Sequence, residues 1–149
     1  MNAIEPFRDT LVRAGFAPER PDDRTTVRFM RDGRMHVLTL ATSDTNDVNV
    51  HVSWRLPEAD DERERLRAAN LTNCFFSGGK VVLDATYRSV AFSVCRTYRT
   101  AEALAPDLAE ICKLLDLMAS FFFARLSAED DGVHEHSAVV SFLRRPASR

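Results

Sequence analysis

The stretch NLTNCFFSGGKVVLD, from Asn70 to Asp84, decides how this chain is put together. Residues with helical spacing lead into it, two glycines interrupt it, and the apolar run after them is typical of a short strand. At about 100° per residue, both asparagines lie on the apolar side of the predicted helix. That side consists of Leu66, Ala69, Asn70, Asn73 and Phe76.

Amides inside an apolar stripe need hydrogen-bond partners, because a buried amide without one costs about 1–3 kcal/mol. We therefore expect Asn70 and Asn73 to bond to nearby backbone or side-chain groups and to tie the helix end to a strand edge or to the following turn. The alternative is that they contact a ligand. Together with Lys80 they form the predicted structural motif of the chain.

Gly78 and Gly79 raise the question of a phosphate-binding loop, which the sequence does not support. SGGK lacks the first glycine at P-loop spacing, and Lys80 is followed by Val81 rather than by Ser or Thr. The loop also precedes a predicted strand, whereas a P-loop opens into a helix. We interpret the two glycines as the permissive backbone that lets the chain leave the helix and begin the strand.

Upstream, the sequence predicts a helix that ends before Gly15 and then a hairpin. TTVRFM and RMHVLTL flank Asp32-Gly33, which is a strong short-range hairpin signal. A two-residue turn pairs Arg31 with Arg34 and sets the register of both strands. The residues that share the face assigned to the core are Val27, Phe29, Arg31, Arg34, His36, Leu38 and Leu40. VNVHVSWRL then alternates without a break, as a half-buried antiparallel strand does.

Downstream, a helix is expected from about Glu58, followed by strands in KVVLD and SVAFSVCRTY and by a last helix from near Pro106 to about Leu126. The predicted fold is α+β in the order α-β-β-β-α-β-β-α, a five-stranded, mostly antiparallel sheet with helices packed on one face. Residues 1–126 form the domain, and residues 127–149 form a tail in which HSAVVSFL is a candidate for one added strand.

Composition is that of an ordinary single domain. The chain has 149 residues, 45% apolar and 28% charged, with a net charge of −2, which does not indicate a nucleic-acid or membrane-surface partner. MNAIEPFRDT lacks the basic start and apolar run of a signal peptide. Cys74, Cys95 and Cys112 are odd in number and far apart, so we expect reduced, semi-buried core thiols in a cytoplasmic protein.

Three stretches resemble a known bacterial family. LVRAGF, VRFMRDGRMHVLTL and AANLTNCFFSGGKVVLD are similar to the YbjN family, often called sensory-transduction regulators. The resemblance covers about residues 4 to 126, and its most specific part is Asn70 and Asn73 followed by Lys80 and a strand. It implies the fold of type III secretion chaperones and a small dimeric adaptor or chaperone-like protein. It offers no catalytic residue to carry over.

Catalysis and metal binding have little support in the sequence. His134 and His136 in HEH would share one face of a strand, but no third ligand lies within sequence reach. His51 and Ser53 share a strand face, yet such neighbours diverge and no orienting acid is indicated, so they do not form a nucleophile–base pair. We predict a protein that is not an enzyme and that holds no metal or cofactor.

The last predicted helix carries two apolar stripes. The first, wide enough for the core, consists of Leu108, Ile111, Leu115, Met118, Ala119 and Phe122. Leu114, Leu117 and Phe121 form the second, about 120° around the helix. We predict a homodimer in which this second stripe meets its copy across a two-fold axis. The alternative is that the tail or the first helix covers it within one chain.

The sheet face away from the helices is the predicted site of partner binding. It presents Arg28, Met30, Met35, Val37, Asn49, His51, Ser53 and Arg55, with Ser93 and Cys95 on the later strands. Methionine adapts its shape and Asn, Ser and Arg bond an exposed backbone, so this face suits an extended polypeptide. An ordinary solvated face, or one capped by the tail, is the alternative.

We therefore predict a protein-binding module, chaperone-like or regulatory, that acts as a homodimer. The other hypothesis is a sensor of a small-molecule or nucleotide-derived signal that uses the same sheet face. Neither nucleic acid nor a membrane is an expected partner.

Overall fold

Five strands form one antiparallel sheet in a computed structural model that describes residues 3–21, 23–58 and 61–128. Their order across the sheet is β1-β2-β3-β5-β4, and every neighbouring pair is antiparallel. The predicted α+β fold and its element order are confirmed. The elements are α1 (Glu5–Arg13), β1 (Thr26–Arg31), β2 (Arg34–Leu40), β3 (Asp47–Arg55), α2 (Glu62–Phe75), β4 (Lys80–Leu83), β5 (Ser89–Thr97), the 3-10 helix η1 (Ala101–Asp107) and α3 (Leu108–Ala128).

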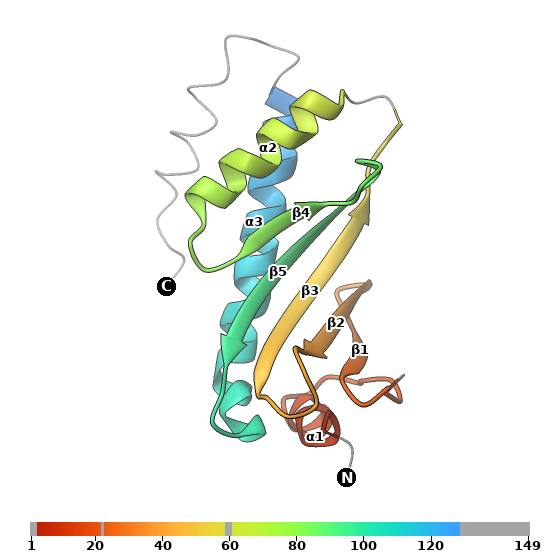
Figure 1. Cartoon of the computed structure of the whole chain (residues 1–149), viewed down its shortest axis with the longest axis vertical. Helices are drawn as coiled ribbons and strands as arrows, with labels where there is room; N and C mark the ends of the chain where they lie inside the picture. Colours follow the sequence, from red (N-terminus) through yellow and green to blue (C-terminus); the bar gives the residue numbers. More distant parts are fainter. Residues whose placement is uncertain (1–2, 22, 59–60, 129–149) are drawn as a thin grey trace.

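One face of the sheet, here the covered face, packs on α3, which runs along β5 and β3 (Figure 1). α2 lies against β4 at one edge of the sheet and packs on α3, while α1 lies at the other end of the molecule against η1. The first apolar stripe predicted for α3 is entirely buried. Aromatic rings fill the centre of the core, where the Phe92 centroid lies 5.3 Å from that of Trp54 and 5.6 Å from that of Phe122.

The hairpin of β1 and β2 has the predicted register. Arg31 is paired with Arg34, and the turn residues Asp32 and Gly33 have φ angles of 51° and 73°. Positive φ at both turn positions gives a twist that matches the flanking strands, and Asp-Gly adopts it readily. The predicted core face is confirmed for Val27, Phe29, His36, Leu38 and Leu40, which are all buried. It is wrong for the pair at the hairpin tip, where Arg31 is half-buried and Arg34 is exposed, because their charged ends reach the rim of the core at Asp116 and Trp54.

Two predictions for α2 are wrong, the first of them its start. The helix begins at Glu62 instead of about Glu58, and Asp61 is its N-cap. The Asp61 carboxylate accepts a hydrogen bond at 3.0 Å from the backbone N–H of Arg63, which satisfies one of the donors left open at a helix start.

The buried side of α2 is also different from the predicted stripe. It consists of Arg65, Ala68, Ala69 and Thr72. Leu66, predicted inside, is 45% exposed. The small side chains let α2 approach its neighbours closely, and the Arg65 guanidinium donates to the backbone carbonyls of Pro57 and Tyr87. A buried arginine with carbonyl partners therefore takes the place that the apolar pattern assigned to a leucine.

The two asparagines of the stretch Asn70–Asp84 have different roles. Asn73 Nδ2 donates to the carbonyl of Val81 at 3.0 Å, and Asn73 Oδ1 accepts from the Val81 N–H at 2.7 Å. The predicted tie between helix end and strand edge is confirmed for Asn73, which closes the outer edge of β4. Both asparagines are exposed, so their placement in the apolar stripe is wrong. The Asn70 side chain makes no hydrogen bond to a described residue.

Packing, rather than backbone freedom, explains the two glycines, because neither has a positive φ. A Cβ on Gly79 would lie 2.3 Å from Met118 Sδ and 3.1 Å from the carbonyl oxygen of Ser93. A Cβ on Gly78 would lie 3.2 Å from Leu114 Cδ2. The turn between α2 and β4 therefore lies directly on α3, and the expectation of a merely permissive backbone is corrected.

Three further predictions have mixed outcomes. Cys112 is buried, but Cys74 and Cys95 are exposed, so these two are not core thiols. α3 begins at Leu108, close to the predicted start near Pro106, and it continues to Ala128, just past the predicted end near Leu126; the 3-10 helix η1 that leads into it was not predicted. The candidate strand HSAVVSFL and the pair His134 and His136 lie outside the described residues.

Candidate binding face of the sheet

The strand register brings all eight predicted partner-binding residues onto one face of the sheet, here the open face. Arg28 is paired with Val37, Val37 with His51, and Met30 with Met35. The other members alternate along β3 with buried valines of the covered face; they are Asn49, Ser53 and Arg55. The open-face residues are half-buried or exposed, as a sheet face without helices on it requires (Figure 1).

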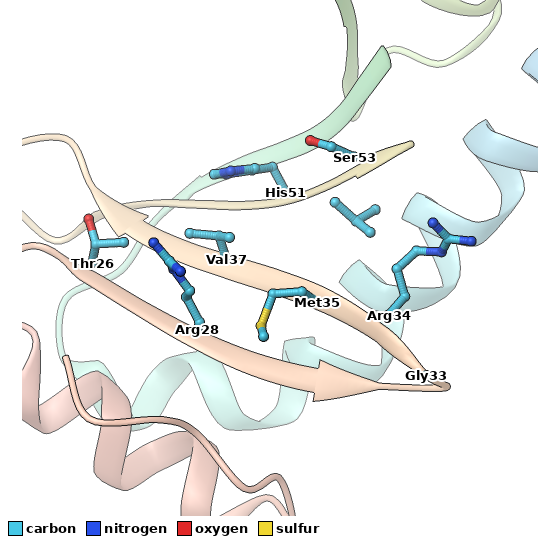
Figure 2. Close-up of a pocket in the computed structure, with 9 residues that line it drawn as sticks. Thr26, Arg28, Gly33, Arg34, Met35, Val37, His51 and Ser53 are labelled. Atoms are coloured by element: carbon cyan, nitrogen blue, oxygen red, sulfur yellow. The ribbon is translucent and has the colours of Figure 1, made fainter. Parts of the chain in front are cut away.

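Part of the open face is a hollow of about 580 Å³ over β1, β2 and β3. Its lining includes Thr26, Arg28, Met35, Val37, His51 and Ser53. Figure 2 shows Arg28, Val37 and His51 side by side on the three neighbouring strands. Thr26, which was not among the predicted site residues, lies two residues before Arg28 and therefore on the same strand face.

Two polar atoms of this face, Asn49 Oδ1 and His51 Nδ1, are buried without a hydrogen-bond partner among the described residues. A buried polar atom without a hydrogen-bond partner costs about 1–3 kcal/mol. Burial, and next the proximity of His36, lower the pKa of His51, so its ring is neutral at pH 7. A neutral imidazole and an amide oxygen are groups that bond peptide N–H and C=O groups.

The hairpin tip beside the hollow is fixed to the rest of the molecule. Arg31 donates two hydrogen bonds to the carboxylate of Asp116 on α3, at 3.0 and 2.8 Å. The guanidinium of Arg34 lies 4.1 Å from the centroid of the Trp54 ring, and Figure 2 shows it directed away from His51. A bidentate ion pair and a cation–π contact hold the short hairpin in place, so the hollow exists before any partner binds.

β4 contributes further residues to the open face through β5. Lys80 is paired with Ser93, which is paired with His51, and Val82 is paired with Ala91. The sequence analysis assigned Lys80 only to the structural motif. Its place on the open face depends on β5 lying between β3 and β4, which is a non-local pairing that the alternation within one strand does not reveal.

The residues of the second α3 stripe are not equally accessible. Leu117 is 39% exposed, Leu114 is half-buried, and Phe121 is only 4% exposed. The Phe121 ring stacks on Phe75 with centroids 4.9 Å apart and meets Phe76 at 5.6 Å. Phe121 is therefore covered within the chain, as the alternative to a dimer proposed. The covering rings belong to Phe75 in α2 and to Phe76 at its C-cap, and not to the first helix.

The described residues do not bring together a metal centre. Among them, no group of three or more His, Cys, Asp or Glu side chains is placed to hold a metal ion. Burial raises the pKa of the Cys112 thiol, which keeps it protonated and poorly nucleophilic. Over the same part of the chain, no helix has both the length and the apolar character to cross a bilayer.

Comparison with known proteins finds relatives in structure alone. No protein-family model and no curated protein matches the sequence. YbjN from E. coli, described as a candidate transcription regulator, gives a TM-score of 0.63 at 12% identity over 85% of this chain and 91% of that one. A chain of the HopA1–SchA chaperone–effector complex gives 0.54 at 15% identity over 79% of this chain and 91% of that one. The chain therefore has the YbjN-like, chaperone-like fold that the resemblance implied, and at these identities the likeness is one of fold.

Proposed function

We propose that this chain is a non-enzymatic binding module, chaperone-like or regulatory, whose open face binds an extended segment of a polypeptide. The observation that carries the proposal is the pair of buried polar atoms without a partner among the described residues, Asn49 Oδ1 and His51 Nδ1. His51 lines the hollow together with the apolar Met35 and Val37. An extended backbone offers N–H and C=O groups at close spacing, so a single ligand satisfies both atoms.

Both edges of the sheet are engaged, which favours binding on the face over addition of a strand. Asn73 bonds both backbone groups of Val81 on β4, and the Glu19 N–H donates to the carbonyl of Arg28 on β1 at 2.8 Å. A strand added at either edge would have to displace these hydrogen bonds. The HopA1–SchA structure is a chaperone–effector complex, and this supports a polypeptide as the class of partner.

The small-molecule hypothesis gains no comparable support. The described residues that line the hollow come from β1, β2, β3 and the β1–β2 turn, so the hollow has one wall and no opposing one. Sites for small ligands are clefts that bury most of the ligand surface.

We further propose a homodimer whose interface centres on Leu117. This side chain lies one helical turn before Phe121, whose ring stacks on Phe75, and Phe75 is itself 38% exposed. The two exposed side chains therefore belong to one apolar patch at the junction of α3 and α2. Apolar side chains that gather on a surface mark interfaces, and a two-fold axis through the patch would bury it against its copy.

Capture of polypeptides by the tagged protein from its source organism, followed by affinity measurement with the purified client, tests the binding face. Met35→Glu and His51→Glu should each weaken client binding by about tenfold or more, because a carboxylate at the hollow disrupts contacts worth about 1.4 kcal/mol or more. Ala109→Glu, on the exposed side of α3, is the matched control and should leave the affinity unchanged. If both face variants bind as tightly as the control, the open face is not the site.

Light scattering at high micromolar concentration tests the dimer. The unsubstituted protein should be a dimer, Leu117→Glu should be a monomer, and Ala109→Glu on the same helix should remain dimeric. Phe121→Glu is unsuitable, because Phe121 is buried and the variant would lose packing within the chain. A monomeric unsubstituted protein contradicts the proposal, as does a dimeric Leu117→Glu variant.

A further inference from the structure

One row of side chains crosses the open face from edge to edge. Arg28 on β1 is paired with Val37, Val37 with His51, His51 with Ser93, and Ser93 with Lys80 on β4. This cation-ended row takes one residue from each strand of the sheet. An arginine stands at one edge, a lysine stands at the other, and the three side chains between them are not formally charged at pH 7.

The rows on either side of the cation-ended row contain no charged residue. On one side they are Met30, Met35, Ser53, Ala91 and Val82. On the other side they are Thr26, Thr39, Asn49 and Cys95. The other charged strand residues on this face stand at the two ends of β3, where Arg55 is paired with Ser89 and Asp47 with Thr97. The Asp47 carboxylate accepts a hydrogen bond from the Thr97 hydroxyl at 2.6 Å.

The strand residues of the open face carry a net positive charge, opposite in sign to that of the whole chain. The charged ones are Arg28, Arg55 and Lys80 with the carboxylate of Asp47, whereas the chain has a net charge of −2. Glu19, whose N–H donates to the carbonyl of Arg28, adds one carboxylate beside the β1 edge. Cationic side chains at the two edges of a face attract anionic groups and orient them.

We propose that the cation-ended row binds an extended polypeptide that crosses the strands and carries two carboxylates about six residues apart. This inference rests on the proposed function and specifies its client. Adjacent strands lie about 4.8 Å apart, so the four spacings between Arg28 and Lys80 span about 19 Å. An extended chain advances about 3.3 Å per residue and covers that span in about six residues.

The spacing of six also meets a second requirement. Side chains of an extended chain alternate between two sides, so residues separated by an even number project to the same side. Both carboxylates can therefore reach down to Arg28 and Lys80 at once. The backbone between them passes over Val37, His51 and Ser93, beside the unpaired acceptor of Asn49.

Three nine-residue peptides, blocked at both ends and labelled for fluorescence polarisation, test the proposal. The first alternates threonine and valine and carries glutamates at its second and eighth positions. The second has glutamines at those positions, and the third has the composition of the first with its glutamates at the second and fourth positions. The first should bind about fivefold or more tightly than either of the others.

Substitutions then assign the preference to the row. Arg28→Gln and Lys80→Gln should each remove the advantage of the first peptide over the other two. Arg55→Gln is the matched control, because it removes a cation of the same face that lies outside the row, and it should keep the preference for the wider spacing. Thermal melts should show that the three variants remain folded, since these side chains are exposed.

The outcomes separate this inference from the proposed function. Equal binding of the three peptides, weakened throughout by Met35→Glu, overturns the carboxylate inference and leaves the proposed binding face standing. Absence of binding by all three, or binding that Met35→Glu does not change, overturns both. An oligothymidylate that displaces the first peptide and binds more tightly assigns the row to phosphates and overturns the inference as well.

Discussion

The covered and open faces of the sheet are built from alternate residues of the same strands, yet they satisfy opposite requirements. On β5, Phe92 is fully buried among aromatic rings, whereas the next residue, Ser93, lies half-buried on the open face. The open face holds polar atoms that lack partners, namely Asn49 Oδ1 and His51 Nδ1, among the described residues. Burial of apolar side chains therefore concentrates on the covered face, and the open face is the one that we propose binds a partner.

Phe92→Ala should have the largest effect, a loss of about 3–5 kcal/mol in the free energy of unfolding, because it leaves a cavity beside Trp54 and Phe122. Such a loss is a large part of the total stability of a small domain. Ser93→Ala, one residue along on the open face, should change stability by about 0.5 kcal/mol or less. Urea unfolding of the two variants measures the contrast, and equal losses would contradict the division between the faces.

Gly79→Ala should cost about 1–3 kcal/mol by forcing atoms apart where the α2–β4 turn lies on α3. The new methyl group meets the buried end of Met118 and the backbone oxygen of Ser93. Gly78→Ala should cost less, because its nearest contact, Leu114 Cδ2 at 3.2 Å, is a milder conflict. Urea unfolding again gives the free energies.

A double-mutant cycle identifies the source of the Gly79 effect. In a Met118→Ala background the methyl group has space, so Gly79→Ala should cost measurably less there than in the unsubstituted protein. Strictly additive effects would show that Met118 is not the source of the cost of Gly79→Ala.

Asn73→Asp comes next, with an expected loss of about 1–3 kcal/mol, because an ionised carboxylate cannot donate to the Val81 carbonyl. The remaining acceptor bond from the Val81 N–H would persist while the two oxygens repel. Asn70→Asp, one turn earlier and exposed, should change stability by about 0.5 kcal/mol or less. Similar thermal melts for the two variants would show that the edge bonds of Asn73 contribute little.

Local periodicity accounts for what the sequence predicted correctly. Asp32-Gly33 sets the register of the hairpin, and alternation along β3 separates the core valines from His51 and Ser53. Both signals lie within a few residues of chain, as does the apolar stripe of α3 that packs on the sheet. The open face could therefore be predicted in large part from the sequence.

Non-local contacts account for what the sequence missed. Arg65 is buried because carbonyls of Pro57 and Tyr87, from different parts of the chain, converge on it, and no spacing within α2 reveals that. Lys80 reaches the open face only because β5 lies between β3 and β4. Phe121 looks exposed by helical geometry alone, and it is buried because Phe75 stacks on it.

The pH dependence of stability should have the smallest effect, and it compares one histidine from each face. His36 lies on the covered face, 2% exposed. Its Nδ1 lies 3.0 Å from the carbonyl oxygen of Arg34, so Nδ1 donates, and Nε2 has no partner among the described residues. Burial is the main cause that lowers the pKa of His36, and Arg31 adds to it, while the Arg34 carbonyl, Asp116 and Asp32 act in the opposite direction.

The direction in which stability changes with pH follows from the linkage between proton binding and folding. Because the pKa of His36 in the folded chain is below its ordinary value of 6.5, the unfolded chain takes up the proton first as pH falls. Stability is therefore complete above about pH 6.5 and decreases as pH falls through that value toward the folded pKa. The same direction holds for His51, whose pKa burial also lowers.

Urea unfolding between about pH 7.5 and pH 5.5 should show this loss in the unsubstituted protein and a smaller loss in His36→Phe, which keeps a ring against Phe29. This pH range excludes the titration of Asp23 and Asp84, whose lowered pKa values lie below 3.8.

His51→Gln should also flatten the dependence of stability on pH. A bound client should reduce the contribution of His51 to that dependence but not the contribution of His36, because the client covers only the open face. An unchanged slope in His36→Phe would show that the buried ring does not control the response. A client that altered the contribution of His36 alone would locate binding away from the open face.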